Sequence, residues 1–98
     1  MMVTFDESSV WERTSALPFQ EMDDELVVVD PATRQVHLLN ATAARIWMLL
    51  ADARSLPTLV AALEEEFDAP AAALRAEVEA FLTEMSDKRL CASRSAER

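Results

Sequence analysis

The sequence predicts a small α+β domain in which a three-stranded antiparallel sheet is followed by three helices. Three observations lead to this prediction. The chain has 98 residues, of which 51% are hydrophobic and 28% are charged, and such a chain builds one modest core. From residue 17 to residue 39 the apolar side chains follow the pattern of short strands, and the period changes from two to 3.6 residues at Asn40. Helix-capping residues stand at that change and again at Ser55.

Three strands are expected between residues 17 and 39. Residues 17–22 alternate weakly, and Pro18 is typical of an edge strand or of the start of a strand. The run of β-branched residues within 25–30 is bounded by Asp23-Asp24 and by Pro31, which predicts a buried strand. The third strand covers 35–39. It forms a hairpin with the second strand, since only about four residues separate them.

The first two helices are predicted from their caps and apolar stripes. Asn40 and Ser55 are expected at the two N-caps, where a side-chain oxygen accepts a bond from a backbone N–H. Pro57 is tolerated in the first turn of the second helix. The first stripe contains Ala43, Ile46, Trp47 and Leu50, and the second contains Leu56, Leu59, Val60, Leu63 and Phe67. We expect the first helix to end near residue 52 and the second before Asp68.

The third helix is expected from about Pro70 to Asp87. Proline suits a first helical turn, and Lys88 and Arg89 complement the helix dipole at the other end. Its apolar side chains are Leu74, Val78, Phe81, Leu82 and Met85. A three-stranded meander cannot bury both of its faces, so the helices must cover one of them. Three helices beside a small sheet make a winged-helix-like architecture.

The remaining segments are expected to be flexible. Residues 1–16, which include Trp11, mix polar, acidic and apolar side chains without a period, and they predict an N-terminal arm. Residues 17–91 form the domain. Residues 92–98 are mostly polar and predict a flexible tail.

Composition excludes several classes of function. The net charge is −9 and Lys88 is the only lysine, so no nucleic-acid partner is expected. The chain has one cysteine, one histidine and no glycine, which excludes intrachain disulfides, zinc ligand clusters and glycine-rich phosphate loops. No apolar run reaches the roughly 18 residues of a membrane span and no secretory signal is visible, so we expect no membrane partner and a cytoplasmic protein. Catalytic residues, metal sites and cofactors are not expected.

Single chemistry-bearing residues have structural explanations. We expect Trp47 in the core rather than as a binding anchor, and Cys91 as a packing residue rather than a nucleophile. Glu64, Glu65 and Glu66 point in different directions from consecutive helix positions, so a solvated face is favoured over a metal site. The acidic residues between Glu64 and Asp87 either attract a basic partner or provide solubility.

Residues 30–59 carry a resemblance to a known family. An acidic, proline-containing hairpin turn begins at Asp30, and residues 36–47 join a Leu-Asn helix start to alanine-rich positions and an Ile-Trp pair. A second helix start, Ser-Leu-Pro-Thr-Leu, follows at 55–59. These features resemble the PqqD-like family of recognition elements for ribosomally synthesised, modified peptides, over about residues 20–90. Thr33-Arg34 stands where family members commonly carry glycine, and the Leu-Leu-Ala-Pro-Glu-Arg signature of pyrroloquinoline-quinone pathway members is absent.

The resemblance implies a stand-alone peptide-binding chaperone. Such a protein binds the leader of a ribosomally synthesised precursor peptide and presents it to a maturation enzyme, which is a radical-SAM enzyme, a leader protease or a cyclase. The leader is implied to add as a strand beside the third strand, in a groove against the third helix. The implied peptide-binding residues are Arg34, Gln35, Val36, His37 and Leu38 on the strand and Leu74, Arg75, Val78 and Leu82 on the helix.

Two other functions remain open from the sequence. A winged-helix transcription regulator would place the third helix on DNA, although Glu77, Glu79, Glu84 and Asp87 would meet phosphates there. The chain is alternatively a non-catalytic subunit of a larger enzyme complex. A monomer and a strand-exchanged dimer are both compatible with a free strand edge.

Overall fold

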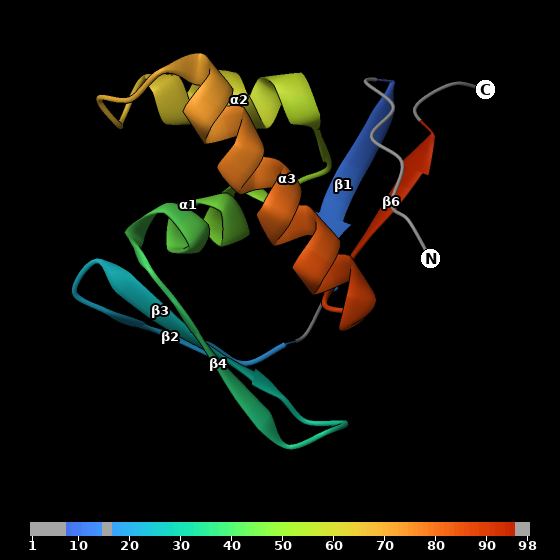
Figure 1. Ribbon diagram of the computed structural model, residues 1–98. Helices are drawn as coiled ribbons and strands as arrows, with labels where there is room; N and C mark the ends of the chain where they lie inside the picture. The colour runs from blue at the N-terminus through green and yellow to red at the C-terminus, as the bar shows by residue number, and fades with distance from the viewer. Residues whose placement is uncertain (1–7, 15–16, 96–98) are drawn as a thin grey trace.

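The computed structural model describes residues 8–14 and 17–95, and these residues form two antiparallel sheets and three helices (Figure 1). One sheet has the order β2–β3–β4, with β2 at Phe19–Met22, β3 at Glu25–Asp30 and β4 at Gln35–Leu39. The other has the order β5–β1–β6, with β5 at Arg54–Ser55, β1 at Ser9–Arg13 and β6 at Cys91–Ser95. The helices are α1 at Ala41–Leu49, α2 at Leu56–Glu64 and α3 at Ala71–Asp87. The predicted α+β class, three-stranded meander and three helices are confirmed.

The β2–β3–β4 sheet turns one face toward the helices. Along β3, Leu26, Val28 and Asp30 are buried, whereas the residues between them are partly exposed. This alternation continues across the sheet, since Leu39 of β4 lies opposite Leu26 and is also buried. The strand therefore follows the period-two pattern of a sheet with one covered face.

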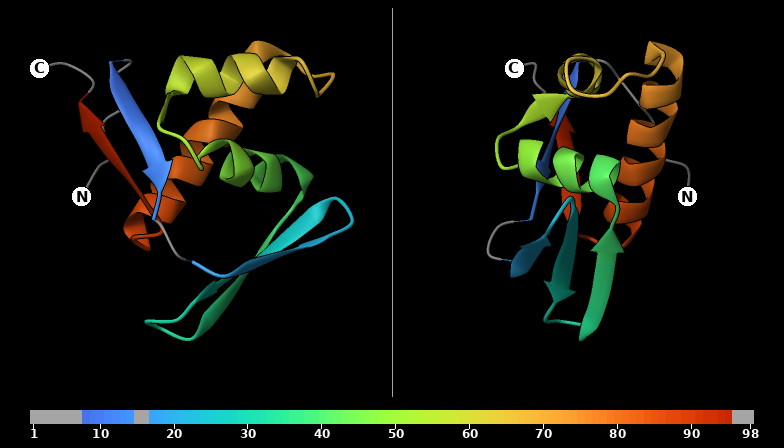
Figure 2. Two further views of the ribbon diagram at one scale, coloured as in Figure 1. Left: turned by 180° about the vertical axis from the view of Figure 1, so that it is seen from behind. Right: turned by 90° about the vertical axis from the view of Figure 1, so that its left-hand side faces the viewer.

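The helices stack above that face. Figure 2 shows α1 between the β2–β3–β4 sheet and α2, with α3 running alongside the stack. The predicted caps are confirmed: Asn40 accepts a hydrogen bond from the N–H of Ala43 at 2.9 Å, and Ser55 accepts one from the N–H of Thr58 at 3.3 Å. Because Asn40 directly follows β4, the first cap also fixes where the strand gives way to the helix.

Trp47 lies at the centre of the core and has no exposed surface. Its ring meets the ring of Phe19 edge-on, with centroids 6.3 Å apart. The guanidinium of Arg13 lies 5.4 Å from the centroid of the Trp47 ring. The expectation that Trp47 is a core residue rather than a binding anchor is confirmed.

The N-terminal segment differs from the expectation of an arm without regular structure. Ser9–Arg13 form β1, which pairs with β5 and with β6, and the side chain of Trp11 is 1% exposed. Ser9–Arg13 and Cys91–Ser95 are thus paired strands. The remaining residues of the expected arm and tail, except residues 8 and 14, lie outside the described residues. Sequence patterns missed this sheet because β1 and β6 come from opposite ends of the chain and neither alternates clearly.

Three turns of this glycine-free chain place other residues in the left-handed region. Asp23 has a φ of 59° between β2 and β3, Arg34 has a φ of 62° between β3 and β4, and Arg89 has a φ of 62° after α3. Glycine adopts such angles with less strain because it has no Cβ. At the two hairpin positions, Asp23 and Arg34, the chain therefore carries a side chain at a backbone angle that glycine would adopt with less strain.

Replacing Trp11 by alanine tests the assignment of β1 to the core. We expect Trp11→Ala to lower the free energy of unfolding by about 3–5 kcal/mol, as for other buried aromatic residues. The measurement is urea denaturation followed by circular dichroism. Glu12→Ala is the matched control, because Glu12 is exposed on the same strand. Equal stability of the two variants would show that β1 does not belong to the core.

Candidate functional site

β4 has one free edge, since β3 is its only neighbour among the described strands. The N–H of Val29 donates to the carbonyl of Pro18 at 2.9 Å, on the side away from β4. Val29 therefore does not bond to Val36, which lies opposite it on β4. Backbone direction alternates along an antiparallel strand, so the N–H and C=O groups of Val36 and Leu38 point out of the sheet. A further strand can bond to both residues.

A groove of about 370 Å³ lies along this edge, between β4, the start of α1, and α3. It is lined by Val36, His37, Leu38, Leu39, Asn40, Ala43, Phe81, Glu84 and Met85. A smaller hollow of about 210 Å³ continues it, bounded by Asn40, Thr42, Ala43, Ile46, Glu77, Ala80, Phe81 and Glu84. Lower-numbered residues of α3 thus face the start of α1, and higher-numbered ones face β4. β4 and α3, which form the two walls of the groove, therefore run in opposite chain directions along it.

The strand half of the predicted site is brought together at the groove. Val36, His37 and Leu38 line it directly. Arg34 and Gln35 precede them along the chain and are exposed at the hairpin end of the same edge. The five predicted strand residues therefore form one continuous stretch beside the groove.

The helix half differs from the sequence-based expectation. Leu74, Val78 and Leu82 are 2%, 0% and 0% exposed and pack in the hydrophobic core. Wholly buried side chains do not contact a peptide at the surface, so these three residues belong to the core rather than to the lining. Arg75 forms an ion pair with Glu79 at 3.0 Å and does not line the groove.

The α3 residues that line the groove beside β4 are Phe81, Glu84 and Met85. Their spacing places them on one face of the helix. The sequence contains this signal, but the apolar stripe of α3 is broad, and its pattern does not say which part turns toward β4. Phe81 and Met85 are mostly buried, yet they also form the wall of the groove.

The outer face of the sheet is apolar next to the groove. Val36 and Leu38 are 63% and 64% exposed, and their partners on β3, Val29 and Val27, are partly exposed on the same face. Met22 on β2 is 52% exposed. A peptide strand beside β4 would extend this face as well as filling the groove.

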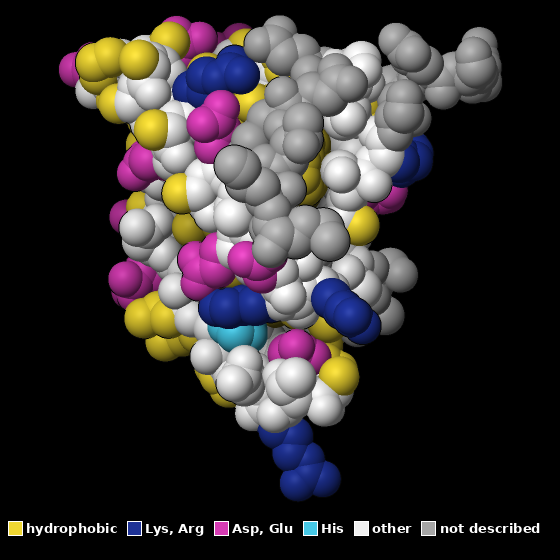
Figure 3. All heavy atoms as spheres, turned by 45° about the vertical axis from the view of Figure 1, so that its right-hand side comes forward, with side chains coloured by type: hydrophobic (Ala, Val, Ile, Leu, Met, Phe, Trp, Pro, Cys, Tyr) yellow, Lys and Arg dark blue, Asp and Glu magenta, His cyan; other side chains and the backbone are white. Residues whose placement is uncertain are grey.

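His37 lies on the inner side of β4, opposite Val28, and lines the groove. Its Nε2 atom is buried and has no hydrogen-bond partner in the described part of the chain. Figure 3 shows the ring at the surface beside a basic side chain, with acidic side chains beyond it. His37 therefore adds a polar nitrogen to a groove lining that also includes Asn40 and Glu84.

Other titratable residues do not assemble a second site in the described residues. Glu64, Glu65 and Asp68 are exposed, and Glu66 pairs with Arg45 at 2.6 Å. Residues 8–14 and 17–95 hold no group of three or more potential metal ligands. Within the same ranges, no helix has the length and apolar character needed to cross a membrane.

Cys91 is buried, with its Sγ atom 4.0 Å from the carbonyl oxygen of Leu82. Desolvation by burial raises the pKa of this thiol to about 12. The nucleophilic form of cysteine is the thiolate, which is therefore scarce at neutral pH. The position and the pKa both fit a packing role.

Two solved structures share this fold. The structure of TbiB1 in complex with the TbiA(beta) leader peptide matches with a TM-score of 0.73 and 25% identity, covering 82% of this chain and 93% of that chain. The solution NMR structure of the PqqD truncation of Methylobacterium extorquens PqqCD, a functional and stand-alone recognition element for ribosomally synthesised, modified peptides, matches with a TM-score of 0.73 and 18% identity. That match covers 91% of this chain and 95% of the other.

No curated protein matches the chain. The model of one protein family does match, namely coenzyme PQQ synthesis protein D (PqqD), over residues 25–90. This segment runs from β3 to the end of α3 and so includes both walls of the groove. Since the match spans well over half of the sequence and the fold agrees, the chain belongs to the PqqD family.

Proposed function

We propose that this protein binds the leader of a ribosomally synthesised precursor peptide along β4, presents it to a maturation enzyme and catalyses no step itself. The observation that carries the proposal is the free edge of β4 beside a groove that is lined by both apolar and polar side chains. Val36 and Leu38 turn unpaired backbone groups outward at that edge, and α3 supplies the opposite wall. This is the arrangement used for β-augmentation.

Backbone bonds and side-chain contacts have separate roles in this mode of binding. The N–H and C=O groups of Val36 and Leu38 can form four hydrogen bonds with the leader. Each bond contributes a net stabilisation of about 0.5–1.5 kcal/mol. Leader residues opposite His37 and Leu39 would face Phe81 and Met85 in the groove, because side chains alternate along a strand. Those opposite Val36 and Leu38 would cover the outer face of the sheet. The backbone thus provides affinity, and the groove selects the sequence.

The similarity to TbiB1, whose structure includes a leader peptide, supports this proposal. We further propose that the partner enzyme is a radical-SAM enzyme, a leader protease or a cyclase, and that binding takes place in the cytoplasm, where precursor peptides are made. One chain carries both walls of the groove, which favours a monomer as the binding form. A strand-exchanged dimer would use the same edge and would compete with the leader.

The charge of α3 argues against DNA as the ligand. Its exposed residues include Glu77, Glu84 and Asp87, and a recognition helix with these side chains would meet DNA phosphates with like charge. The packing role of Cys91 argues against thiol catalysis. The first point supports a peptide-binding module over a transcription regulator, and the second supports a non-catalytic role.

The direct test is an NMR titration of the isotope-labelled full chain with a synthetic leader. The probe is the N-terminal segment of a short precursor-like open reading frame next to the gene, and duplex DNA is the comparison. We expect the largest shift changes at residues 35–39 and at Phe81, Glu84 and Met85. Changes confined to the β5–β1–β6 sheet would contradict the proposed site, as would a response to DNA alone.

Proline substitution tests the role of the free edge. Val36→Pro removes an outward N–H, so no bond within the sheet is lost, and we expect leader binding to weaken at least about tenfold. The matched control is Glu21→Pro on β2, the strand at the other edge of the sheet. Because backbone direction alternates along β2 as well, the N–H of Glu21 also points out of the sheet. Both variants should keep the native circular dichroism spectrum. Equal binding by the two, measured by fluorescence anisotropy, would rule out docking on β4.

Cys91 provides a test of the non-catalytic assignment. With a pKa of about 12 in the folded protein against 9.0 for an ordinary thiol, Cys91 should react slowly with iodoacetamide at pH 8 and rapidly in urea. The stabilisation from the neutral thiol is complete below about pH 9 and is lost as the pH rises toward 12, since the unfolded state ionises first. Cys91→Ala should still stimulate the partner enzyme. Loss of that stimulation in a folded variant would show that the thiol takes part in the chemistry.

A further inference from the structure

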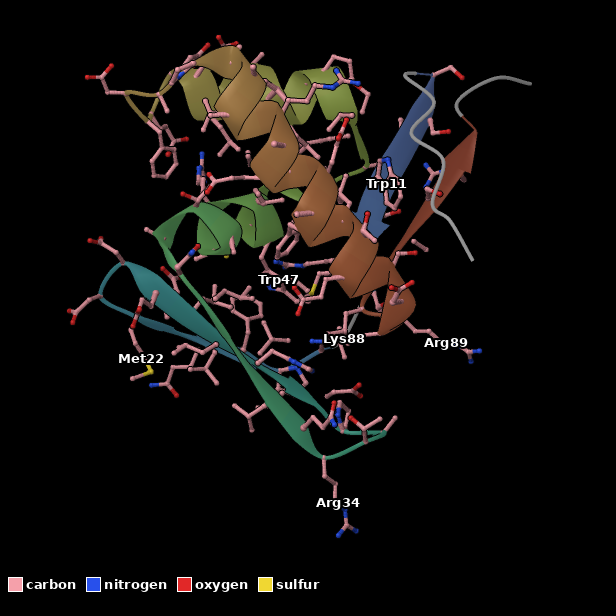
Figure 4. The ribbon with its side chains drawn as sticks, in the orientation of Figure 1. Trp11, Met22, Arg34, Trp47, Lys88 and Arg89 are labelled. Carbon is pink, nitrogen blue, oxygen red and sulfur yellow. The ribbon has the colours of Figure 1, made fainter. Side chains whose placement is uncertain are left out.

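The two ends of the groove differ in charge. At the end beside Asn40, Glu77 lines the hollow and is exposed, and no ion pair joins it to another described residue. At the hairpin end, Arg34 is exposed and also has no ion-pair partner among the described residues. Figure 4 shows the Arg34 side chain pointing away from the body of the domain. An unpaired anion and an unpaired cation thus stand at opposite ends of the docking edge.

The residues between these ends reinforce the difference. Glu84 lines both parts of the groove, and Lys88 pairs with it at 2.8 Å. Because α3 runs opposite to β4 along the groove, Lys88 lies beyond Glu84 toward the hairpin end. Along the groove, α3 therefore changes from an acid without an ion-pair partner among the described residues, Glu77, to the ion pair of Glu84 with Lys88, in the direction that leads to Arg34.

Building on the proposed function, we propose that the groove reads the order of charges along the leader. A Lys or Arg side chain near the start of the docked segment lies against Glu77, with Glu84 beside it. An Asp or Glu side chain about five residues later lies against Arg34. The spacing follows from β4 itself, because a leader residue opposite Leu39 faces α3 and one opposite Arg34 faces outward, and the five residues from Arg34 to Leu39 span about 17 Å when extended.

The direction of the leader follows from the sheet. Both existing pairs, β2 with β3 and β3 with β4, are antiparallel. Antiparallel pairing is also slightly more stable per residue than parallel pairing. A leader that continues this pattern starts beside Asn40 and ends beside Arg34, so its basic residue precedes its acidic one. The opposite order would place like charges together at both ends.

The magnitude of this effect is set by solvent exposure. An ion pair at an exposed position changes affinity by up to about fivefold, and salt screens it. Charge order therefore selects among leaders that the strand edge and the groove already bind. Repulsion in the wrong order adds to the discrimination.

Three display libraries test the proposal without knowledge of the natural leader. Each carries 11-residue peptides with apolar residues randomised between two fixed positions five residues apart, so that the two charges lie on opposite faces of the added strand. One library has Lys first and Glu second, one has Glu first and Lys second, and one has Gln at both positions. We expect the first library to give the strongest binders at low salt, with affinities about tenfold above the second, and the advantage to shrink in high salt.

Each other outcome has a distinct meaning. Equal enrichment of the three libraries would overturn charge reading and leave the peptide groove standing. Preference for Glu first would overturn the proposed direction and with it the proposal. A lack of binders in every library would count against the groove itself, and both the proposed function and the charge order would fail.

Glycine substitutions separate charge reading from stability. Arg34→Gly removes the cation from a left-handed position, so the melting temperature should stay equal or rise, while binding of a Lys-first peptide should weaken roughly two- to fivefold. Asp23→Gly is the matched control, since it removes a charge from the other left-handed hairpin position, away from β4. It should not weaken binding. Arg34→Glu should restore binding to a peptide that carries Lys at both positions, and failure of that rescue would contradict the assigned contact.

Discussion

Arg13 joins the two sheets to the first helix, and the groove depends on that junction. Its guanidinium lies 4.9 Å from the Phe19 ring and 5.4 Å from the Trp47 ring, and it donates a hydrogen bond to the carbonyl of Trp47 at 3.2 Å. Its backbone N–H donates to the carbonyl of Leu50 at 3.0 Å. Cation–π contacts that are shielded from water reach about 2 kcal/mol. Because β1, β2 and the C-terminal half of α1 are held at this one point, the helix has a fixed position against both sheets. Its start is held separately by the Asn40 cap, directly after β4.

The groove combines a general feature with a particular one. The free edge of β4 presents backbone groups that every peptide can meet, whereas Phe81, Glu84 and Met85 present side chains that only some peptides fit. Structures with 18% and 25% identity share this fold at a TM-score of 0.73. Backbone geometry therefore persists when most side chains differ. Differences in leader preference between such proteins would then lie in the wall formed by α3 and at the ends of the edge.

Local signals in the sequence were sufficient for most of the elements. The β-branched run of β3, the caps at Asn40 and Ser55 and the stripe of α3 each depend on neighbours within a few residues. The β5–β1–β6 sheet was missed because its strands do not alternate clearly and their partners are distant in the chain. Trp11 illustrates the difference. Nothing near it in the sequence indicates a buried position, and only its docking beside α2 and β6 excludes solvent from it.

The family resemblance implied that the strand at residues 35–39 forms half of the candidate site. The sequence by itself determined the α+β class, the presence of that strand, and a composition with few basic, thiol or imidazole side chains. These conclusions follow from composition, period and capping, which are local properties. Only the tertiary structure decided which residues of α3 face β4. Leu74, Val78 and Leu82 share one apolar stripe with Phe81 and Met85, and the rotation of the helix that separates core from groove is set by packing against α1, α2 and the sheet. Packing of this kind depends on contacts between distant segments, and no local pattern encodes it.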